Sequence, residues 1–183
     1  MENQIEISTE RLILKSLTPA IIHEIFNTKS DEEIMSYFGF DENGLEHHRE
    51  MHEKGMEMHR LSLFVFLLIE KETGLSIGEC GFHTWNKMHN RAEIFYIMHD
   101  EGSKKKGYMT EALKAVLEYG FTELKLHRIE ALIADENEPS KRLLLRYGFS
   151  KEGTMREDYA VNGKNEDSDC YSLLKWEWEK YQS

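Results

Sequence analysis

The chain has 183 residues, 40% of them hydrophobic, and a formal net charge of −11 at pH 7. This length suits a single domain with a sizeable core, spanning 1–183. The negative charge argues against nucleic-acid binding through phosphate and favours cationic partners. The longest apolar run, Leu63–Ile69, is too short to cross a bilayer, and the N-terminus lacks the apolar core of a signal peptide.

Two cysteines, Cys80 and Cys170, form neither a disulfide framework nor a metal motif. Both fall in strand-like segments, where a cysteine usually acts as a small buried hydrophobe. We therefore expect a soluble protein of the reducing cytoplasm, with no membrane or nucleic-acid partner.

The first half of the chain predicts three helices among strands. Thr18 and Pro19 form a typical helix start, and Glu72-Thr73-Gly74 is a turn between two strand patterns. In chain order we predict a strand at Arg11–Ser16, helices at Pro19–Thr28, Asp31–Tyr37 and Leu45–Arg60, a hairpin of Leu61–Lys71 and Leu75–His83, and a strand at Ala92–His99.

The second half adds two helices to the strands. We predict an amphipathic helix ending near Glu123, a strand at His127–Ala134, a helix at Pro139–Tyr147, and a closing hairpin of Phe149–Tyr159 and Asp169–Glu177. There is no repeat or linker. The pattern predicts a single α/β domain with a mixed sheet of seven strands flanked by helices.

A cationic turn, Lys104-Lys105-Lys106-Gly107, joins the Ala92–His99 strand to the amphipathic helix. One face of that helix is apolar, so its first turn is held against a core while its free N–H groups point outward. Those donors, the helix dipole and the lysines favour an anion, and Gly107 allows close approach to the backbone. We interpret this turn as a pyrophosphate site. The alternative is an ordinary helix start.

Three motifs occur in a characteristic order: Gly107-Tyr108-Met109-Thr110-Glu111-Ala112, then Asn137-Glu138-Pro139-Ser140-Lys141-Arg142, then Gly148-Phe149. Together they resemble the signature of the GNAT acyl-CoA N-acetyltransferases. Thr9-Glu10-Arg11-Leu12, Glu152-Gly153 and Asp169-Cys170-Tyr171-Ser172-Leu173-Leu174 further resemble the branch that contains the ribosomal-protein N-terminal acetyltransferases. The resemblance extends over about residues 9–178. It implies the GNAT fold: a largely antiparallel, twisted sheet, splayed between its fourth and fifth strands.

The resemblance also implies acetyl-CoA as cosubstrate. Its pyrophosphate would lie on the backbone of Lys105–Met109, and its pantetheine arm beside the strand. Lys104 stands where the family usually has Arg or Gln, and Met109 where it has Gly or Ala. The residues expected to bind the cosubstrate are Ile97, Met98, His99, Lys104, Lys105, Lys106, Gly107, Tyr108, Met109, Thr110, Asn137 and Ser140. Asn137 and Ser140 could instead serve as turn and helix-cap residues.

Amine acetylation requires a base to deprotonate the acceptor. Strand alternation places Glu93 in a mostly apolar row with Phe95, Ile97 and His99, where burial would raise its pKa. Glu93 also matches the glutamate base of the histone acetyltransferase branch. Glu79 on the preceding strand is the second candidate, acting through a water. Either carboxylate could instead pair with a cation or face solvent.

Many relatives carry a tyrosine that protonates the departing thiolate, at the position occupied here by Leu144. Tyr147 cannot be assumed to replace it, because a shift of three residues changes the direction of the side chain. Ser140 is the better candidate by resemblance. A thiol with a pKa near ~8.5 also leaves tolerably without an acid. By resemblance, backbone N–H groups near Ile97 and Met98 would hold the carbonyl oxygen.

The acceptor and its groove are predicted by resemblance. Tyr37, Phe38 and the Phe40–Glu46 loop are expected to wall the groove, and His83 and Trp85 could line it or pack at its rim. His48 and His52 stand four residues apart, with His47 and His59 nearby; we expect a solvated helix and no metal.

We expect a protein N-terminus as the acceptor, with a polyamine or another small amine as the alternative. An acetyl-CoA-binding module without turnover is a further alternative, because Lys104, Met109 and Leu144 depart from the family pattern. Dimers are frequent in the family, so a homodimer is expected.

Overall fold

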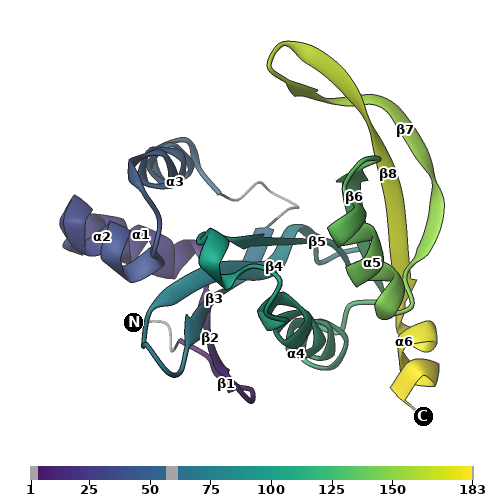
Figure 1. The fold of residues 1–183 in the computed structure, drawn as a ribbon, viewed down its shortest axis with the longest axis horizontal. Helices are drawn as coiled ribbons and strands as arrows, with labels where there is room; N and C mark the ends of the chain where they lie inside the picture. The colour runs from purple at the N-terminus through teal and green to yellow at the C-terminus, as the bar shows by residue number, and fades with distance from the viewer. Residues whose placement is uncertain (1–3, 57–61, 183) are drawn as a thin grey trace.

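The computed structural model describes residues 4–56 and 62–182. Its centre is one sheet of eight strands in the order β1-β2-β3-β4-β5-β6-β8-β7 (Figure 1). All neighbouring strands are antiparallel except β5 and β6, which are parallel. The strands are β1 Glu6–Ser8, β2 Leu12–Leu17, β3 Ser62–Glu70, β4 Ser76–Asn86, β5 Arg91–Met98, β6 Arg128–Ala134, β7 Ser150–Val161 and β8 Lys164–Leu174.

The prediction of seven strands was wrong by one. The additional strand is β1, whose three residues pair with the edge of β2. A segment this short shows no periodicity that could be detected in the sequence. The start of the predicted Leu61–Lys71 strand, at Leu61, lies outside the described residues.

The helices are α1 Pro19–Thr28, α2 Asp31–Phe38, α3 Glu42–Lys54, α4 Tyr108–Thr122, α5 Glu138–Arg146 and α6 Lys175–Gln182, with a short 3-10 helix at Glu101–Ser103. The first three follow capping residues: Thr18, Ser30 and Asp41 each accept a hydrogen bond from a backbone N–H of the first turn. Across the described parts of the chain, no helix combines the length and apolar character needed to span a membrane.

Several predicted boundaries were wrong, including those of α3 and β8. Helix α3 begins at Glu42 rather than Leu45, because Asp41 caps it, and it ends at Lys54; residues 57–61 of the predicted element are not described. The predicted strand Asp169–Glu177 stops at Leu174. There the Leu174 N–H donates a hydrogen bond of 2.9 Å to the Glu177 carboxylate, and α6 begins.

The two faces of the sheet carry separate cores. Helices α1, α2 and α3 cover one face, where Ile22, Ile34 and Phe38 pack on Val65 and Leu67 of β3. Helices α4 and α5 lie against the other face, whose buried cluster is centred on Leu12, Phe66, Cys80, Phe82, Ala92, Ile94, Leu113, Val116, Leu117 and Leu144 (Figure 1). Because side chains alternate along each strand, β2, β3 and β5 contribute to both cores.

The sheet opens between β5 and β6. These strands pair only from Arg91 to Glu93 and from Arg128 to Glu130, while β5 continues to Met98 and β6 to Ala134. Counted without β1, β5 and β6 are the fourth and fifth strands of the sheet. The sheet therefore separates where the splay was predicted. It leaves the second half of β5 without a partner on the β6 side.

Strands β7 and β8 form a long hairpin that extends past β6 (Figure 1). Its turn is Asn162-Gly163, and both residues have positive φ, 51° and 78°. This backbone conformation is the one that Asn-Gly hairpin turns favour. The sequence predicted the hairpin and β7 up to Tyr159, but not the start of β8 over residues 164–168. Strand β7 is exposed along nearly its whole length.

Candidate active site

The predicted anion site lies at the start of α4. Gly107 is the N-terminal cap residue with φ +83°, and no side chain of the described residues caps the helix there. Lys105 also has positive φ, 61°. The first N–H groups of α4 therefore remain available behind an exposed backbone, an arrangement that suits a pyrophosphate.

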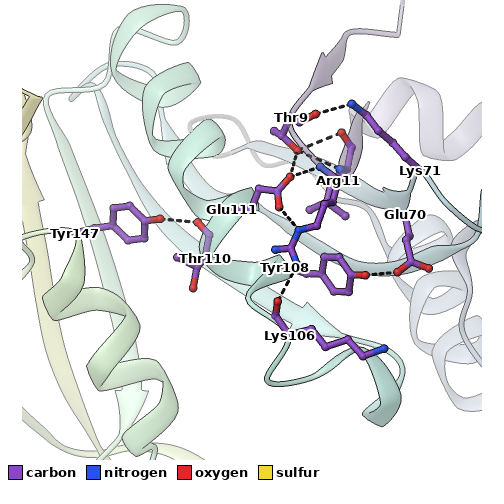
Figure 2. A network of polar contacts seen from close by, with 10 residues as sticks. Thr9, Arg11, Glu70, Lys71, Lys106, Tyr108, Thr110, Glu111 and Tyr147 are labelled. Atoms are coloured by element: carbon purple, nitrogen blue, oxygen red, sulfur yellow. Dashed lines mark hydrogen bonds and ion pairs between the residues drawn. The ribbon is translucent and has the colours of Figure 1, made fainter.

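A polar network holds this helix start to the beginning of β2 (Figure 2). The Glu111 carboxylate accepts hydrogen bonds from the Thr9 hydroxyl at 2.6 Å, the Arg11 N–H at 2.6 Å and Arg11 Nε at 2.8 Å. Arg11 Nη1 also donates to the Lys106 carbonyl at 2.9 Å. Thr9 and Arg11 belong to the first motif of the sequence and Glu111 to the motif that begins at Gly107, so the network joins two motifs that lie far apart in the chain.

Several residues predicted to bind the cosubstrate have side chains that are already engaged. Tyr108 is buried, and its hydroxyl donates to the Glu70 carboxylate. Met109 packs against the α4 core, in agreement with its place on the apolar face. Of these two residues, only the backbone is free to face a ligand. Thr110 is half-buried, and its carbonyl accepts from the Tyr147 hydroxyl (Figure 2).

The three lysines of the turn are exposed but not equivalent. Lys104 forms an ion pair with Glu101 three residues earlier. Its charge is thus partly neutralised by a neighbour. Lys105 and Lys106 follow directly, next to the N-terminus of α4, and supply the positive charge of the predicted anion site.

Glu93 lies where β5 and β6 part. Its side chain is 17% exposed and lies 3.6 Å from His83 Nε2 on the neighbouring strand. Burial, together with the negative charges of Glu130 and Asp158, raises the pKa of Glu93 to about 7. Glu93 and His83 line a cavity of about 420 Å³ between β5 and β6, to which Asn137 and Ser140 also contribute. A carboxylate with this pKa can accept a proton near neutral pH.

Glu79 lies deeper, 5% exposed, on the same face of the sheet as Glu93. Its Oε1 atom makes no hydrogen bond but lies 3.5 Å from His48 Nε2 of α3. Burial lowers the pKa of His48, whereas the attraction of Glu79 raises it by more. The pKa of His48 therefore lies above its ordinary value. Glu79 therefore faces His48 and forms an ion pair with it when that histidine is protonated; pairing with a cation was the alternative to a catalytic role.

A second cavity, of about 950 Å³, opens over the α1–α3 face of the sheet. It shares His83, Phe95 and Tyr96 with the smaller one. Its walls include most of the predicted groove residues of the 40–46 loop, together with Met51, Leu63, Glu79, Ile97, Met98 and His99. Among the described residues, no lysine or arginine lines either cavity, whereas four carboxylates do: Asp41, Glu79, Glu93 and Asp158.

The predicted backbone donors on β5 differ in orientation. The His99 N–H donates to the Ile77 carbonyl at 3.0 Å, and hydrogen-bonded pairs alternate along an antiparallel ladder. The Glu79–Ile97 pair is therefore bonded to β4, and the Met98 N–H turns towards the opening. Met98 rather than Ile97 can hold an oxygen there. The His99 ring contacts the Phe38 carbonyl at 3.1 Å, and burial lowers its pKa.

Helix α5 begins at the edge of the smaller cavity. Asn137 caps it, accepting a hydrogen bond of 3.2 Å from the Ser140 N–H, so its side chain performs the capping role that was the alternative. Ser140 is 9% exposed and lines the cavity. Leu144 is buried in the core, and the Tyr147 hydroxyl is committed to the Thr110 carbonyl. Neither can protonate a ligand in the cavity.

The sequence analysis missed Tyr96. Its ring lines both cavities, its hydroxyl is buried without a hydrogen-bond partner, and burial raises its pKa to about 12, with Ser140 acting in the opposite direction. The pattern that could have identified Tyr96 is the alternation of side chains along β5, which places Tyr96 and Glu93 on opposite faces of the strand.

Trp85 packs against Phe64 of the α4 core, at 6.4 Å between ring centroids, and lines neither cavity, so it has the packing role that was its alternative. The prediction for His48 was wrong. His48 points into the larger cavity rather than into solvent. His52 Nδ1 lies 2.7 Å from His23 Nδ1. The parts of the chain that the structure describes contain no cluster of residues suited to a metal, and His59 is not among them.

Known proteins with this sequence pattern and fold are acetyltransferases. Residues 11–150 match the model of the acetyltransferase (GNAT) domain. The uncharacterized N-acetyltransferase YoaA of Bacillus subtilis (strain 168) is 35% identical over 179 residues, which cover 92% of this chain and 96% of YoaA. A second relative, YdaF of the same strain, is described provisionally as a ribosomal N-acetyltransferase. It is 38% identical over 106 residues, which cover 58% of this chain and 57% of YdaF.

A solved structure has the same fold. It is the spermidine N-acetyltransferase from Vibrio cholerae in complex with CoA and spermine, with a TM-score of 0.68 and 26% identity, covering 92% of this chain and 98% of that chain. The match to the domain model covers most of the sequence, and YoaA matches over nearly its whole length. The chain therefore belongs to the GNAT family of N-acetyltransferases and has its single α/β fold.

Proposed function

We propose that this acyltransferase moves the acetyl group of acetyl-CoA to a primary amine, with Glu93 as general base. The observation that carries the proposal is the position of Glu93, half-enclosed at the point where the sheet opens, with a pKa of about 7. An amine nucleophile must lose a proton to attack a thioester. A carboxylate with a pKa near the working pH accepts that proton efficiently.

The proposed cosubstrate site runs from the α4 turn into the opening. The backbone of Lys105–Met109 and the two unpaired lysines of the turn would hold the pyrophosphate, and the free edge of β5 would accompany the pantetheine arm. Acetyl-CoA supplies the activated acyl group. The Met98 N–H would stabilise the negative charge that develops on the carbonyl oxygen.

The acceptor would enter through the larger cavity, because that cavity lies on the face to which Glu93 and Glu79 belong. A protein N-terminus remains our first proposal. The walls contain apolar side chains, including Phe40, Met51 and Leu63, that suit the first residues of a peptide. Glu79 would attract the incoming ammonium group when His48 is neutral.

A polyamine is the second candidate, and a different observation favours it. Four carboxylates line the two cavities, and none of the described lining residues is a lysine or arginine. A chain with several ammonium groups complements this distribution. Spermine is the ligand named in the solved relative from Vibrio cholerae.

The test is thiol release from acetyl-CoA with a panel of acceptors: N-terminal peptides with apolar or acidic first residues, spermidine, spermine and a simple monoamine. Binding of acetyl-CoA is measured in parallel by calorimetry. Turnover with peptides or with polyamines identifies the acceptor class. Tight binding with no turnover on any acceptor would support the alternative of a binding module, and absence of binding would refute the proposal.

A further inference from the structure

A buried carboxylate oxygen faces an imidazole nitrogen in the wall of the larger cavity. The Glu79 side chain is 6% exposed, and its Oε1 atom lies 3.5 Å from His48 Nε2 without making a hydrogen bond. The Nδ1 atom of His48 lies 3.0 Å from the Gly44 carbonyl oxygen. Because a carbonyl oxygen can only accept, Nδ1 carries a hydrogen. In the neutral ring Nε2 is then an acceptor too, and two acceptors face each other with no donor between them.

The imidazole is held in this position. The rings of Phe38 and Phe40 lie against it, with centroids 5.3 and 4.7 Å from its own, and the Gly44 carbonyl fixes Nδ1. Burying a carboxylate oxygen without a donor is costly, so this arrangement requires one. The donor is either a proton on His48 or a cation that enters the cavity, because no lysine or arginine is among the described residues that line it.

The spacing along β4 indicates which part of an acceptor reaches Glu79. His83 pairs with Glu93 across β4 and β5, and Glu79 lies four residues from His83 on the same face of β4. Four residues of a strand span about 13 Å. Gly81, between Glu79 and His83, has no side chain, and the two cavities meet at His83 and Phe95. The amine that reacts beside Glu93 and a group held by Glu79 are therefore different parts of one extended acceptor.

We infer that Glu79 and His48 form a subsite for a second ammonium group of the acceptor, which donates to Glu79 Oε1 and His48 Nε2 together. This inference rests on the proposed function, and it assigns the acceptor to the class of long diamines and polyamines. No covalent bond changes at the subsite. His48 gives its proton to water, and the ammonium group takes the place of that proton.

The proton and the ammonium group compete for the same position. Although burial lowers it, the pKa of His48 lies above its ordinary value because of Glu79. The other titratable rings that face His48 are those of His99, whose pKa burial lowers, and of the exposed His47 beside it on α3. Binding of the second ammonium group should therefore release the His48 proton, and it should strengthen as the pH rises.

The test compares diaminooctane, which has an ammonium group at each end, with octylamine, which has the same chain and one ammonium group. Wild type should prefer the diamine by about tenfold or more, in kcat/KM and in calorimetric binding to the CoA complex, because hydrogen bonds between charged groups are among the strongest. Diaminopropane is too short to reach both carboxylates and should gain no such advantage over propylamine.

Glu79→Gln should abolish the preference for diaminooctane, because the amide keeps the shape of the side chain and loses its charge. Glu46→Gln is the matched control and should keep the preference. It makes the same chemical change on α3, at an exposed position that lines neither cavity.

Proton release gives a second readout that does not depend on turnover. Calorimetry in buffers of different ionisation enthalpy should show that wild type releases more protons near pH 7 with the diamine than with the monoamine. The preference should grow roughly threefold or more from pH 6 to pH 8, as the neutral form of His48 increases. His48→Asn can keep an N–H near the Gly44 carbonyl but lacks Nε2, so both effects should disappear in this variant.

Equal affinity of wild type for the diamine and the monoamine, a preference that survives in Glu79→Gln, or equal proton release by both amines would each overturn the inference. Acetylation of either amine with any of these results would leave the proposed function standing. A wild type that binds CoA and prefers the diamine in calorimetry, but acetylates no amine, would refute the function and leave the subsite standing.

Discussion

At the scale of single residues, the site depends on two carboxylates of one sheet face that differ in their partners. Glu79 is the more deeply buried, but His48 Nε2 lies 3.5 Å from it and pairs with its charge when protonated. Glu93 is less buried, and its closest titratable neighbour is His83, whose pKa burial lowers, so that it remains neutral near pH 7. Without a cation beside it, Glu93 binds a proton more readily.

The first prediction concerns Glu93→Gln. Because the pKa of Glu93 is raised to about 7, its basic form increases as pH rises through 7. We expect kcat/KM of the wild type to rise with pH over this interval. The variant should lose roughly a hundredfold in kcat and the rise near pH 7, because general bases contribute about 10²- to 10⁴-fold.

The measurement is a pH–rate profile of both proteins with one acceptor, with acetyl-CoA binding measured as a control. Glutamine keeps the shape of the side chain, so binding of acetyl-CoA should stay within about twofold of the wild type. If Glu93→Gln kept both the rate and the pH dependence, Glu93 would not be the base.

At the scale of elements, the position of α4 is fixed by a contact between the first and the central motifs of the sequence. Glu111 accepts three hydrogen bonds from Thr9 and Arg11, and its side chain is only 14% exposed (Figure 2). Removing it would leave the Arg11 N–H without its acceptor. The same change would release the start of α4 from the edge of the sheet.

We therefore predict that Glu111→Ala lowers the free energy of unfolding by about 2 to 3 kcal/mol, since hydrogen bonds to charged groups contribute at the upper end of the usual range. It should also weaken acetyl-CoA binding, because the amide donors at the helix start lose their fixed direction. Chemical denaturation and calorimetry measure the two effects. Glu50→Ala is the control: this glutamate forms an exposed ion pair with Lys54, and its removal should leave the free energy of unfolding nearly unchanged.

Gly107 gives a second prediction at this scale. Its φ of +83° favours glycine, and an added Cβ would meet only Arg11 Nη2 at 3.5 Å within the protein, so the space in front of the residue is open to a ligand. Gly107→Ala should weaken acetyl-CoA binding about tenfold.

Gly163→Ala, in the turn of the β7–β8 hairpin, is the matched control for Gly107→Ala, since it introduces similar strain at φ +78° far along the hairpin. If both variants bound acetyl-CoA equally well, the interpretation of the α4 turn as a phosphate site would be wrong.

The sequence predicted the helices and strands that local residue patterns indicate. It did not predict contacts between residues that lie far apart in the chain. Thr18 and Pro19 mark the start of α1 correctly, and the apolar face of α4 is buried as its spacing indicates. The pairing of His48 with Glu79 joins α3 to β4, and no local pattern reveals which way a histidine on a polar helix points. Tyr96 was missed because an aromatic residue on the core side of a strand is usually packing.

At the scale of the whole molecule, charge distinguishes the two proposed acceptor classes. The net charge of −11 and the four cavity carboxylates attract cations, and the attraction weakens with salt because the Debye length is about 10 Å at 0.1 M. A peptide N-terminus presents one ammonium group near these carboxylates, whereas spermidine presents three. The two proposed acceptor classes therefore predict different salt dependences.

We expect kcat/KM for spermidine to fall by about tenfold or more between 50 and 300 mM salt, as is typical of electrostatically steered association, and kcat/KM for a neutral-sequence peptide to fall by less than about threefold. Asp41→Asn removes an exposed carboxylate of the larger cavity and should reduce the slope for spermidine without affecting the peptide. A polyamine rate that ignores salt would show that the acidic surface does not guide this acceptor. The apolar walls of the cavity, and with them a peptide, would then account for acceptor choice.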